Sequence, residues 1–164
     1  MSRSSVIAFA AAALASLGIS HVGGVRLQTD LAAAAQQKPS GPLVEVFKTP
    51  TCGCCSQWVE HMRKNGFNVH TTDLVDLSAI KKSRGVPGDV QSCHTAVVNG
   101  YVVEGHVPAA DVHRMLKEKP AIAGIAVGGM PIGSPGMETP FVKAQPFDVT
   151  SFDKSGKLRV FAKH

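Results

Sequence analysis

Three cysteines lie within four consecutive positions, at Cys52, Cys54 and Cys55, and they separate two segments of different pattern. Residues 43–47 before them form a short apolar run that is typical of a buried strand. After them, apolar residues recur at the spacing of an amphipathic helix. A strand that leads into a helix through a group of thiols indicates a mixed α/β domain with its chemistry at that junction. With 164 residues, the chain has room for one such domain and not for a multidomain enzyme.

The helix predicted after the cysteines has one apolar stripe and a clear end. Gln57 and Glu60 face away from the stripe, and Gly66 follows Asn65 as a helix stop. The stripe consists of Cys55, Trp58, Val59 and Met62. We therefore expect this helix to pack on a sheet through these four side chains.

The next segment predicts a strand, a helix, a hairpin and a final helix. The hairpin signal is the strongest in the chain, because Asn99-Gly100 separates two segments of high strand propensity. Together with the first strand and helix, this order is that of a thioredoxin-like fold over residues 43–119. The expected elements are a strand at 67–72, a helix at 74–83, hairpin strands at 95–98 and 101–104, and a helix at 108–119.

The C-terminal part, residues 120–164, is interpreted as an extension of the same unit. Glycines and prolines recur through residues 121–140, so we expect a loop without regular structure that wraps over the domain. Residues 147–161 alternate apolar and polar side chains around Asp153-Lys154-Ser155-Gly156, which predicts a second hairpin.

Residues 1–35 have the pattern of an export signal. Arg3 precedes an apolar run at residues 6–19, and small residues up to Ala35 offer a cleavage site. As a helix the run would be about 21 Å long, short of a membrane core of about 30 Å, so we expect cleavage after Ala35. A retained anchor is the alternative. Residues 36–42 then form a polar linker, and the predicted location is the periplasm.

The charge of the chain gives little reason to expect a nucleic-acid partner. The formal net charge is +5, but the densest basic stretch consists only of Lys81, Lys82 and Arg84. Aromatic residues make up 5% of the chain, which leaves few platforms for stacked bases. We interpret these charges as an ordinary solvated surface.

The cysteine spacing suits two kinds of chemistry. Thiols at a helix N-terminus are favoured as thiolates, and Cys52 and Cys55 have the spacing of a thioredoxin-type redox pair. Cys54 adds a third thiol, and converging thiolates suit a soft cation such as Cu(I). Adjacent Cys54 and Cys55 fit a single tetrahedral zinc ion poorly, but they can bridge several Cu(I) ions.

Further soft ligands follow later in the chain. In a thioredoxin-like layout the loop before the hairpin packs against the helix start, which would bring Cys93 and His94 to the first three cysteines. His106, Met130 and Met137 are candidate ligands too, the methionines because they lie in a flexible Gly/Pro segment. We expect core roles for Met62 and Met115, and structural or solvated roles for His61, His70 and His113.

Several motifs in the right order resemble one known family over residues 44–161. They are the segments 49–55, 92–96, 104–109, 129–131 and 133–138. They resemble the domain-of-unknown-function family that includes CopG-type copper-resistance proteins. The resemblance implies a thioredoxin-like fold, a periplasmic location, a multinuclear copper and sulfur site, and a redox role on copper. It implies Cys52, Cys54, Cys55 and Cys93 as Cu(I) ligands, with His94, His106, Met130 and Met137 as further ligands.

Four hypotheses follow from the sequence. The leading one is an exported protein that holds Cu(I), one or several ions per chain, and interconverts copper oxidation states, with other copper-resistance proteins or a periplasmic electron partner. The second is a thiol-disulfide oxidoreductase in which Cys52 attacks and Cys55 resolves. The third is a zinc-stabilised interaction module. The fourth is an inert structural disulfide with two spare thiols.

Overall fold

The computed structural model describes residues 40–164. The predicted export signal and most of the linker lie outside the described residues. The elements are β1 (Leu43–Lys48), α2 (Gly53–Lys64), β2 (Asn68–Asp73), α3 (Ser78–Ser83), a 3-10 helix η2 (Gly88–Val90), β3 (His94–Val98), β4 (Tyr101–Glu104), α4 (Ala109–Glu118), β5 (Gly124–Ala126), β6 (Asp148–Phe152) and β7 (Leu158–Lys163). The predicted mixed α/β class is confirmed, and the predicted order of elements is present from β1 to α4.

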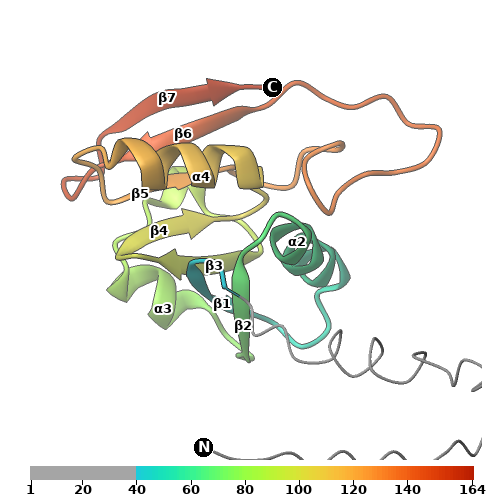
Figure 1. The fold of residues 1–164 in the computed structure, drawn as a ribbon, viewed down its shortest axis with the longest axis horizontal. Helices are drawn as coiled ribbons and strands as arrows, with labels where there is room; N and C mark the ends of the chain where they lie inside the picture. The colour runs from blue at the N-terminus through green and yellow to red at the C-terminus, as the bar shows by residue number, and fades with distance from the viewer. Residues whose placement is uncertain (1–39) are drawn as a thin grey trace, which may run out of the picture. The chain divides into compact units, whose positions relative to one another are not determined.

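The seven strands of residues 40–164 belong to one sheet in the order β2-β1-β3-β4-β5-β6-β7. The pair β1–β2 is parallel and is joined through α2, whereas β1–β3 and β3–β4 are antiparallel. The second hairpin, β6–β7, pairs with β5 and extends the sheet at the end far from β2 (Figure 1). The C-terminal hairpin is therefore continuous with the sheet that carries the cysteine-bearing helix.

The core lies mainly between the sheet and the helices α2 and α4. Trp58 and Met62 of α2 and Met115 of α4 are fully buried in the same apolar cluster as Val44 and Val103. Alternate residues of a strand face opposite sides of a sheet, so Val102 points to the other face. There it packs in a second cluster with Val86, Val90, Ala126 and Phe152. This confirms the predicted core roles of Met62 and Met115.

The segment expected to be a loop contains a strand. Gly124, which reads as a breaker in the sequence, begins β5, which pairs in parallel with β4. A Cβ atom at Gly124 would lie 2.3 Å from Val102 O and 2.7 Å from Phe152 Cζ. The glycine thus permits a close approach of strands, and the prediction of a loop over all of residues 121–140 is wrong for this reason.

The second helix is shorter than predicted. It begins at Ser78 and not at residue 74, because the Asp76 carboxylate accepts hydrogen bonds from Ser78 N (2.9 Å) and Ser78 Oγ (2.7 Å). Such a turn gives the backbone N–H of the first helical residue a hydrogen-bond acceptor and so sets the start of the helix. Within residues 40–164, no helix has the length and apolar character needed to cross a membrane.

Candidate metal centre

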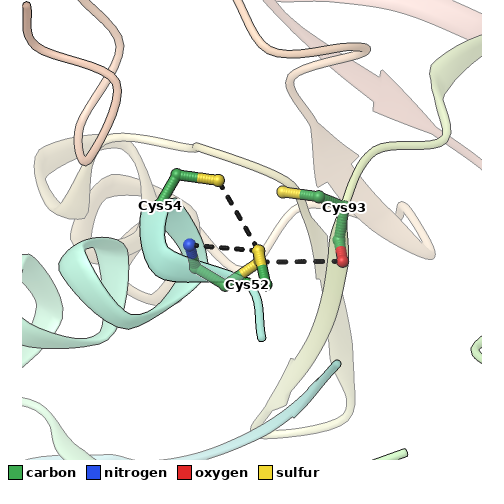
Figure 2. Close-up of side chains that lie close together, drawn as sticks. Cys52, Cys54 and Cys93 are labelled. Carbon is green, nitrogen blue, oxygen red and sulfur yellow. Dashed lines mark hydrogen bonds between the residues drawn. A yellow bond between two sulfur atoms is a disulfide. The ribbon is translucent and has the colours of Figure 1, made fainter. Parts of the chain in front are cut away.

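All four cysteines of the chain meet at one place. Cys52 immediately precedes α2, Cys54 and Cys55 lie in its first turn, and Cys93 immediately precedes β3. Their four Sγ atoms all lie within 4.8 Å of one another. In Figure 2 the thiol of Cys54, on the helix, and that of Cys93, on the neighbouring segment, point toward each other. The expectation that the fold brings Cys93 to the other three cysteines agrees with this geometry.

Two of the four cysteines form a disulfide. Cys52 and Cys55 are bonded to each other with their Cα atoms 5.3 Å apart, whereas Cys54 and Cys93 are free. Cys52 also caps the helix, because its Sγ accepts a hydrogen bond from Cys55 N at 3.3 Å. The free thiols stay close to the disulfide: Cys54 Sγ lies 3.5 Å from Cys52 Sγ, and Cys93 Sγ lies within 4.8 Å of the other three sulfur atoms. The site can therefore hold one disulfide and two thiols or, when reduced, four thiols.

His106 faces Cys93 with a defined tautomer. Its Nδ1 lies 2.8 Å from Pro135 O and its Nε2 lies 3.0 Å from Cys93 Sγ. Because a carbonyl only accepts, Nδ1 carries the proton, and the lone pair of Nε2 points toward the thiol. Burial lowers the pKa of His106, so the imidazole is neutral at neutral pH. A neutral imidazole oriented by a carbonyl has the arrangement of a metal ligand.

His94 is fully buried beside the same thiol. Its Nδ1 lies 3.5 Å from Cys93 Sγ, and its ring packs against Trp58 with centroids 4.4 Å apart. Burial first, then the nearby His106 and Lys81, hold its pKa well below the ordinary value. Within residues 40–164, His94 Nε2 has no hydrogen-bond partner. A buried polar atom without a hydrogen bond costs free energy.

The Cys93 thiol is held in its protonated form. Burial first, and then the proximity of Cys54, raises the pKa of Cys93 to about 12. The thiol hydrogen can be donated to His106 Nε2, the acceptor 3.0 Å away. A metal ion that binds Cys93 must displace this proton, so metal binding here releases protons and strengthens with rising pH.

We expect Cys93 to alkylate slowly in the folded disulfide form. With a pKa of about 12, its thiolate fraction at pH 8 is roughly a thousandfold below that of an ordinary thiol. Its reaction with iodoacetamide, followed by peptide mass spectrometry, should be slower by a similar factor than for the same residue in urea. The rate should rise about tenfold per pH unit up to pH 11. A rate in the folded protein equal to that in urea would contradict the assignment.

A buried carboxylate that the sequence pattern does not reveal positions Cys93. Glu104, at the end of β4, is fully buried, and its Oε1 accepts a hydrogen bond from Ser92 N at 2.7 Å. Its Oε2 accepts one from Thr95 Oγ1 at 2.7 Å. The carboxylate thus binds the residues on both sides of the Cys93-His94 pair. In the sequence it is a lone acidic residue between Val103 and Gly105. The hydrophobic pattern alone does not distinguish a buried glutamate from one at the exposed end of a strand.

Lys81 is the counter-ion of this carboxylate, which corrects the interpretation of the basic stretch. Lys82 and Arg84 are exposed, as expected, but Lys81 is buried, with 7% of its surface accessible. Its Nζ forms a salt bridge with Glu104 and donates to Thr95 Oγ1 at 3.1 Å. The charge is buried because α3 lies against the sheet where β4 presents Glu104.

The Gly/Pro segment after β5 reaches the same place. Pro135 O binds His106, and a Cβ atom at Gly136 would lie 2.8 Å from both Cys54 O and Trp58 N. Gly136 has φ +85°, a conformation that favours glycine. Met137 follows it and is half-buried, whereas Met130 is 53% exposed. The segment therefore packs on the start of α2 through Gly136, and Met137 is the next residue along the chain.

The three histidines expected to have structural or solvated roles lie elsewhere. His70 and His113 are exposed, and His113 Nε2 lies 2.9 Å from Asn65 O. His61, on α2, accepts a hydrogen bond from Ala109 N at 3.0 Å and so ties α2 to the start of α4. None of the three is within the two groups of close metal-binding side chains found in residues 40–164.

Comparison with known proteins relates this chain to a copper resistance protein. A family described as "Protein of unknown function, DUF411" matches residues 90–137, which include Cys93, His94 and His106. No curated protein sequence matches the chain. The solved structure of copper resistance protein CopG, form 2, is 42% identical, covers 76% of this chain and 98% of its own, and superposes with a TM-score of 0.72. Form 1 is 43% identical, with 74% and 96% covered and a TM-score of 0.70. With this identity over nearly the whole of the related chain, the protein belongs to the DUF411 family of copper resistance protein CopG.

Proposed function

We propose that this protein binds copper and holds it as Cu(I) in the cluster of Cys52, Cys54, Cys55 and Cys93. The observation that carries the proposal is the convergence of the four Sγ atoms within 4.8 Å. Thiolates are the ligands that Cu(I) prefers, and the related solved structures are of a copper resistance protein. A thiol-disulfide oxidoreductase needs only two of these four sulfur atoms.

The crowding of the sulfur atoms supports more than one ion per chain. Cys54 and Cys55 are adjacent on one helix turn, so their thiolates reach a common small volume best by bridging different ions. Cys93 faces them from the opposite side, with His94 and His106 beside it. We propose His94, His106, Met130 and Met137 as additional ligands that close the coordination of such ions.

The disulfide supports a redox role on copper. Two thiols can each give one electron to a Cu(II) ion, which yields one disulfide, two Cu(I) ions and two protons. Cys52 and Cys55 are the pair that forms this bond. A thiol reductant or an electron-transfer protein is then needed to return the disulfide to two thiols. In this role the protein is a copper oxidoreductase that works with a periplasmic electron partner or with other copper-resistance proteins.

We propose an exported, periplasmic protein, on the pattern of residues 1–35 and on the disulfide. Disulfides persist in oxidising compartments and are rare in reducing ones. Cys52 and Cys55 would therefore be oxidised outside the cytoplasm unless copper or a reductant keeps them as thiols.

A thiol-disulfide oxidoreductase is the second candidate, and the Cys52–Cys55 disulfide at a helix N-terminus is the observation that favours it. The two functions differ in their need for Cys54. Disulfide exchange uses Cys52 and Cys55 alone, whereas a copper cluster uses all four sulfur atoms.

The experiment that tests the proposal is anaerobic Cu(I) titration of the reduced protein, compared with Cys54→Ser and with Gln57→Ala as an exposed control on the same helix. We expect more than one tightly held Cu(I) per chain in the wild type and in the control, and a loss of at least one ion in Cys54→Ser. If the wild type retains no copper and exchanges rapidly with a disulfide substrate, the protein is a thiol-disulfide oxidoreductase and the copper proposal is wrong.

A further inference from the structure

A groove lies along the exposed side of α2, between this helix and the segment that follows β5. Its volume is about 500 Å³. Side chains between Ser56 and Lys64 form one wall, and Gly136 and Glu138 form the other. A groove of this size can hold a small organic molecule. None of the cysteines lines it, so it is separate from the four-sulfur cluster.

The groove starts beside the disulfide and ends with the last residue of α2. Ser56 lines the first end, and its Oγ donates a hydrogen bond to Cys52 O at 3.3 Å. Lys64 lines the other end, and the rise of the helix places it about 12 Å beyond Ser56. An extended peptide advances by about 3.5 Å per residue. The groove therefore has the length of a peptide of about three residues.

Charges of both signs line the groove. The Glu60 carboxylate is paired with Arg63 at 2.6 Å, which leaves Glu138 and Lys64 as the charges that can meet a ligand. The carboxylate of Glu138 is held at its wall, because Oε2 accepts a hydrogen bond from Gly136 N at 2.7 Å. A ligand with both an ammonium group and a carboxylate complements this pair of charges.

His61 adds a hydrogen-bond donor to the same groove. Its Nε2 accepts from Ala109 N at 3.0 Å, so the neutral ring carries its proton on Nδ1. Burial is the main cause that lowers the pKa of His61, while Glu138 opposes the shift and Lys64 adds to it. Both charges are thus close to the ring, which is neutral at neutral pH. Its Nδ1–H can donate to a carbonyl or carboxylate oxygen of a ligand.

We propose that this groove binds a short peptide thiol, with its carboxylate at Lys64 and its ammonium group at Glu138, as the reductant of the Cys52–Cys55 disulfide. The proposal rests on the proposed function, which needs such a reductant. Cys52 is half-buried and Cys55 is fully buried, so the peptide thiolate attacks Cys52 Sγ.

The reaction balances with two peptide thiols. In the first step a bond forms between the peptide sulfur and Cys52 Sγ, the Cys52–Cys55 bond breaks, and Cys55 leaves as a thiolate that takes up a proton. In the second step another peptide thiolate attacks the sulfur of the bound peptide. Cys52 leaves as a thiolate and is protonated, and the two peptides depart as one disulfide.

The test follows reduction of the copper-free disulfide form by glutathione, a tripeptide thiol with these charges. We expect the rate to saturate with glutathione and to rise linearly with 2-mercaptoethanol, a thiol without charge. In Lys64→Gln the ratio of the two rates below saturation should fall about two- to fivefold, the effect of one exposed ion pair. Lys82→Gln, at an exposed lysine on α3, is the matched control and should keep the ratio.

Cysteine separates the length of the groove from its charges. It carries an ammonium group and a carboxylate but is too short to reach from the disulfide to Lys64, so Lys64→Gln should leave its rate unchanged. A loss with cysteine equal to the loss with glutathione would mean that Lys64 acts by its long-range charge and would overturn the groove as the binding site.

Binding is also measured without reduction and without a variant. S-methylglutathione has no free thiol, and we expect it to shift the nuclear magnetic resonance signals of the His61 ring in the disulfide form. A linear rate with glutathione, an unchanged ratio in Lys64→Gln, or unshifted His61 signals would each overturn the proposal. These measurements contain no copper, so their failure leaves the proposed function to the Cu(I) titration, and failure of that titration leaves the groove to these measurements.

Discussion

Lys81→Met is expected to lower the free energy of unfolding by about 3–5 kcal/mol, because it leaves the Glu104 carboxylate buried without its counter-ion. The Lys81 and Glu104 side chains are 9% and 0% exposed, so solvent screens their interaction little. Urea denaturation of the disulfide form at pH 7 measures the effect. Lys82→Met is the matched control: this neighbour on α3 is exposed and should change stability by less than about 0.5 kcal/mol.

A second variant separates the charge from the hydrogen bonds. In Lys81→Met/Glu104→Gln the amide has no charge to bury, but its oxygen can still accept from Ser92 N and its nitrogen can donate to Thr95 Oγ1. We expect this double variant to be more stable than Lys81→Met alone. A single variant as stable as the wild type, or a double variant less stable than the single one, would show that the ion pair does not hold this part of the fold.

The effect should depend on pH in a defined direction. Burial raises the pKa of Glu104, and Lys81 opposes the rise. Without Lys81 the folded-state pKa rises further above the unfolded value, so the folded protein binds the extra proton. Stability of Lys81→Met is then highest below the unfolded pKa of a glutamate, about 4.3, and is lost as the pH rises through the folded pKa. The deficit against the wild type should therefore shrink between pH 7 and pH 5.

Cu(I) is expected to raise the melting temperature of the reduced protein by about 10 °C or more. Free Cu(I) buffered at about a thousand times its dissociation constant stabilises the folded state by up to about 4 kcal/mol, since Cys93 joins Cys52, Cys54 and Cys55 only in the folded chain. For a domain of this size each kcal/mol raises the melting temperature by a few degrees. Differential scanning calorimetry with and without buffered Cu(I) measures this shift.

Two variants show whether the shift comes from the cluster. Cys93→Ser should lose most of the stabilisation, because Cys93 faces the sulfur atoms of α2 from the opposite side. Gln57→Ala, at an exposed position of the same helix, should keep it. An equal shift in both variants would mean that copper stabilises the protein from another place.

The sequence alone predicted the elements that hold the cysteines. The stripe of Cys55, Trp58, Val59 and Met62 is buried as expected, and Asn99-Gly100 turns the β3–β4 hairpin. These features depend on short-range periodicity and turn chemistry, which a single sequence shows directly. The strand β5 could not be predicted in this way, because a glycine marks a loop in one context and a close strand contact in another.

The sequence by itself determined which atoms are available to the site: three thiols at a helix start, one more before a hairpin, and a histidine on each side of that hairpin. Only the tertiary structure decided how they are used. It brings Cys93 to the helix start, pairs Cys52 with Cys55, and turns His106 Nε2 toward sulfur through Pro135. It also buries Lys81 against Glu104, which fixes the segment before β3. These contacts join residues far apart in the chain, so their geometry and burial arise only when the sheet and its helices pack.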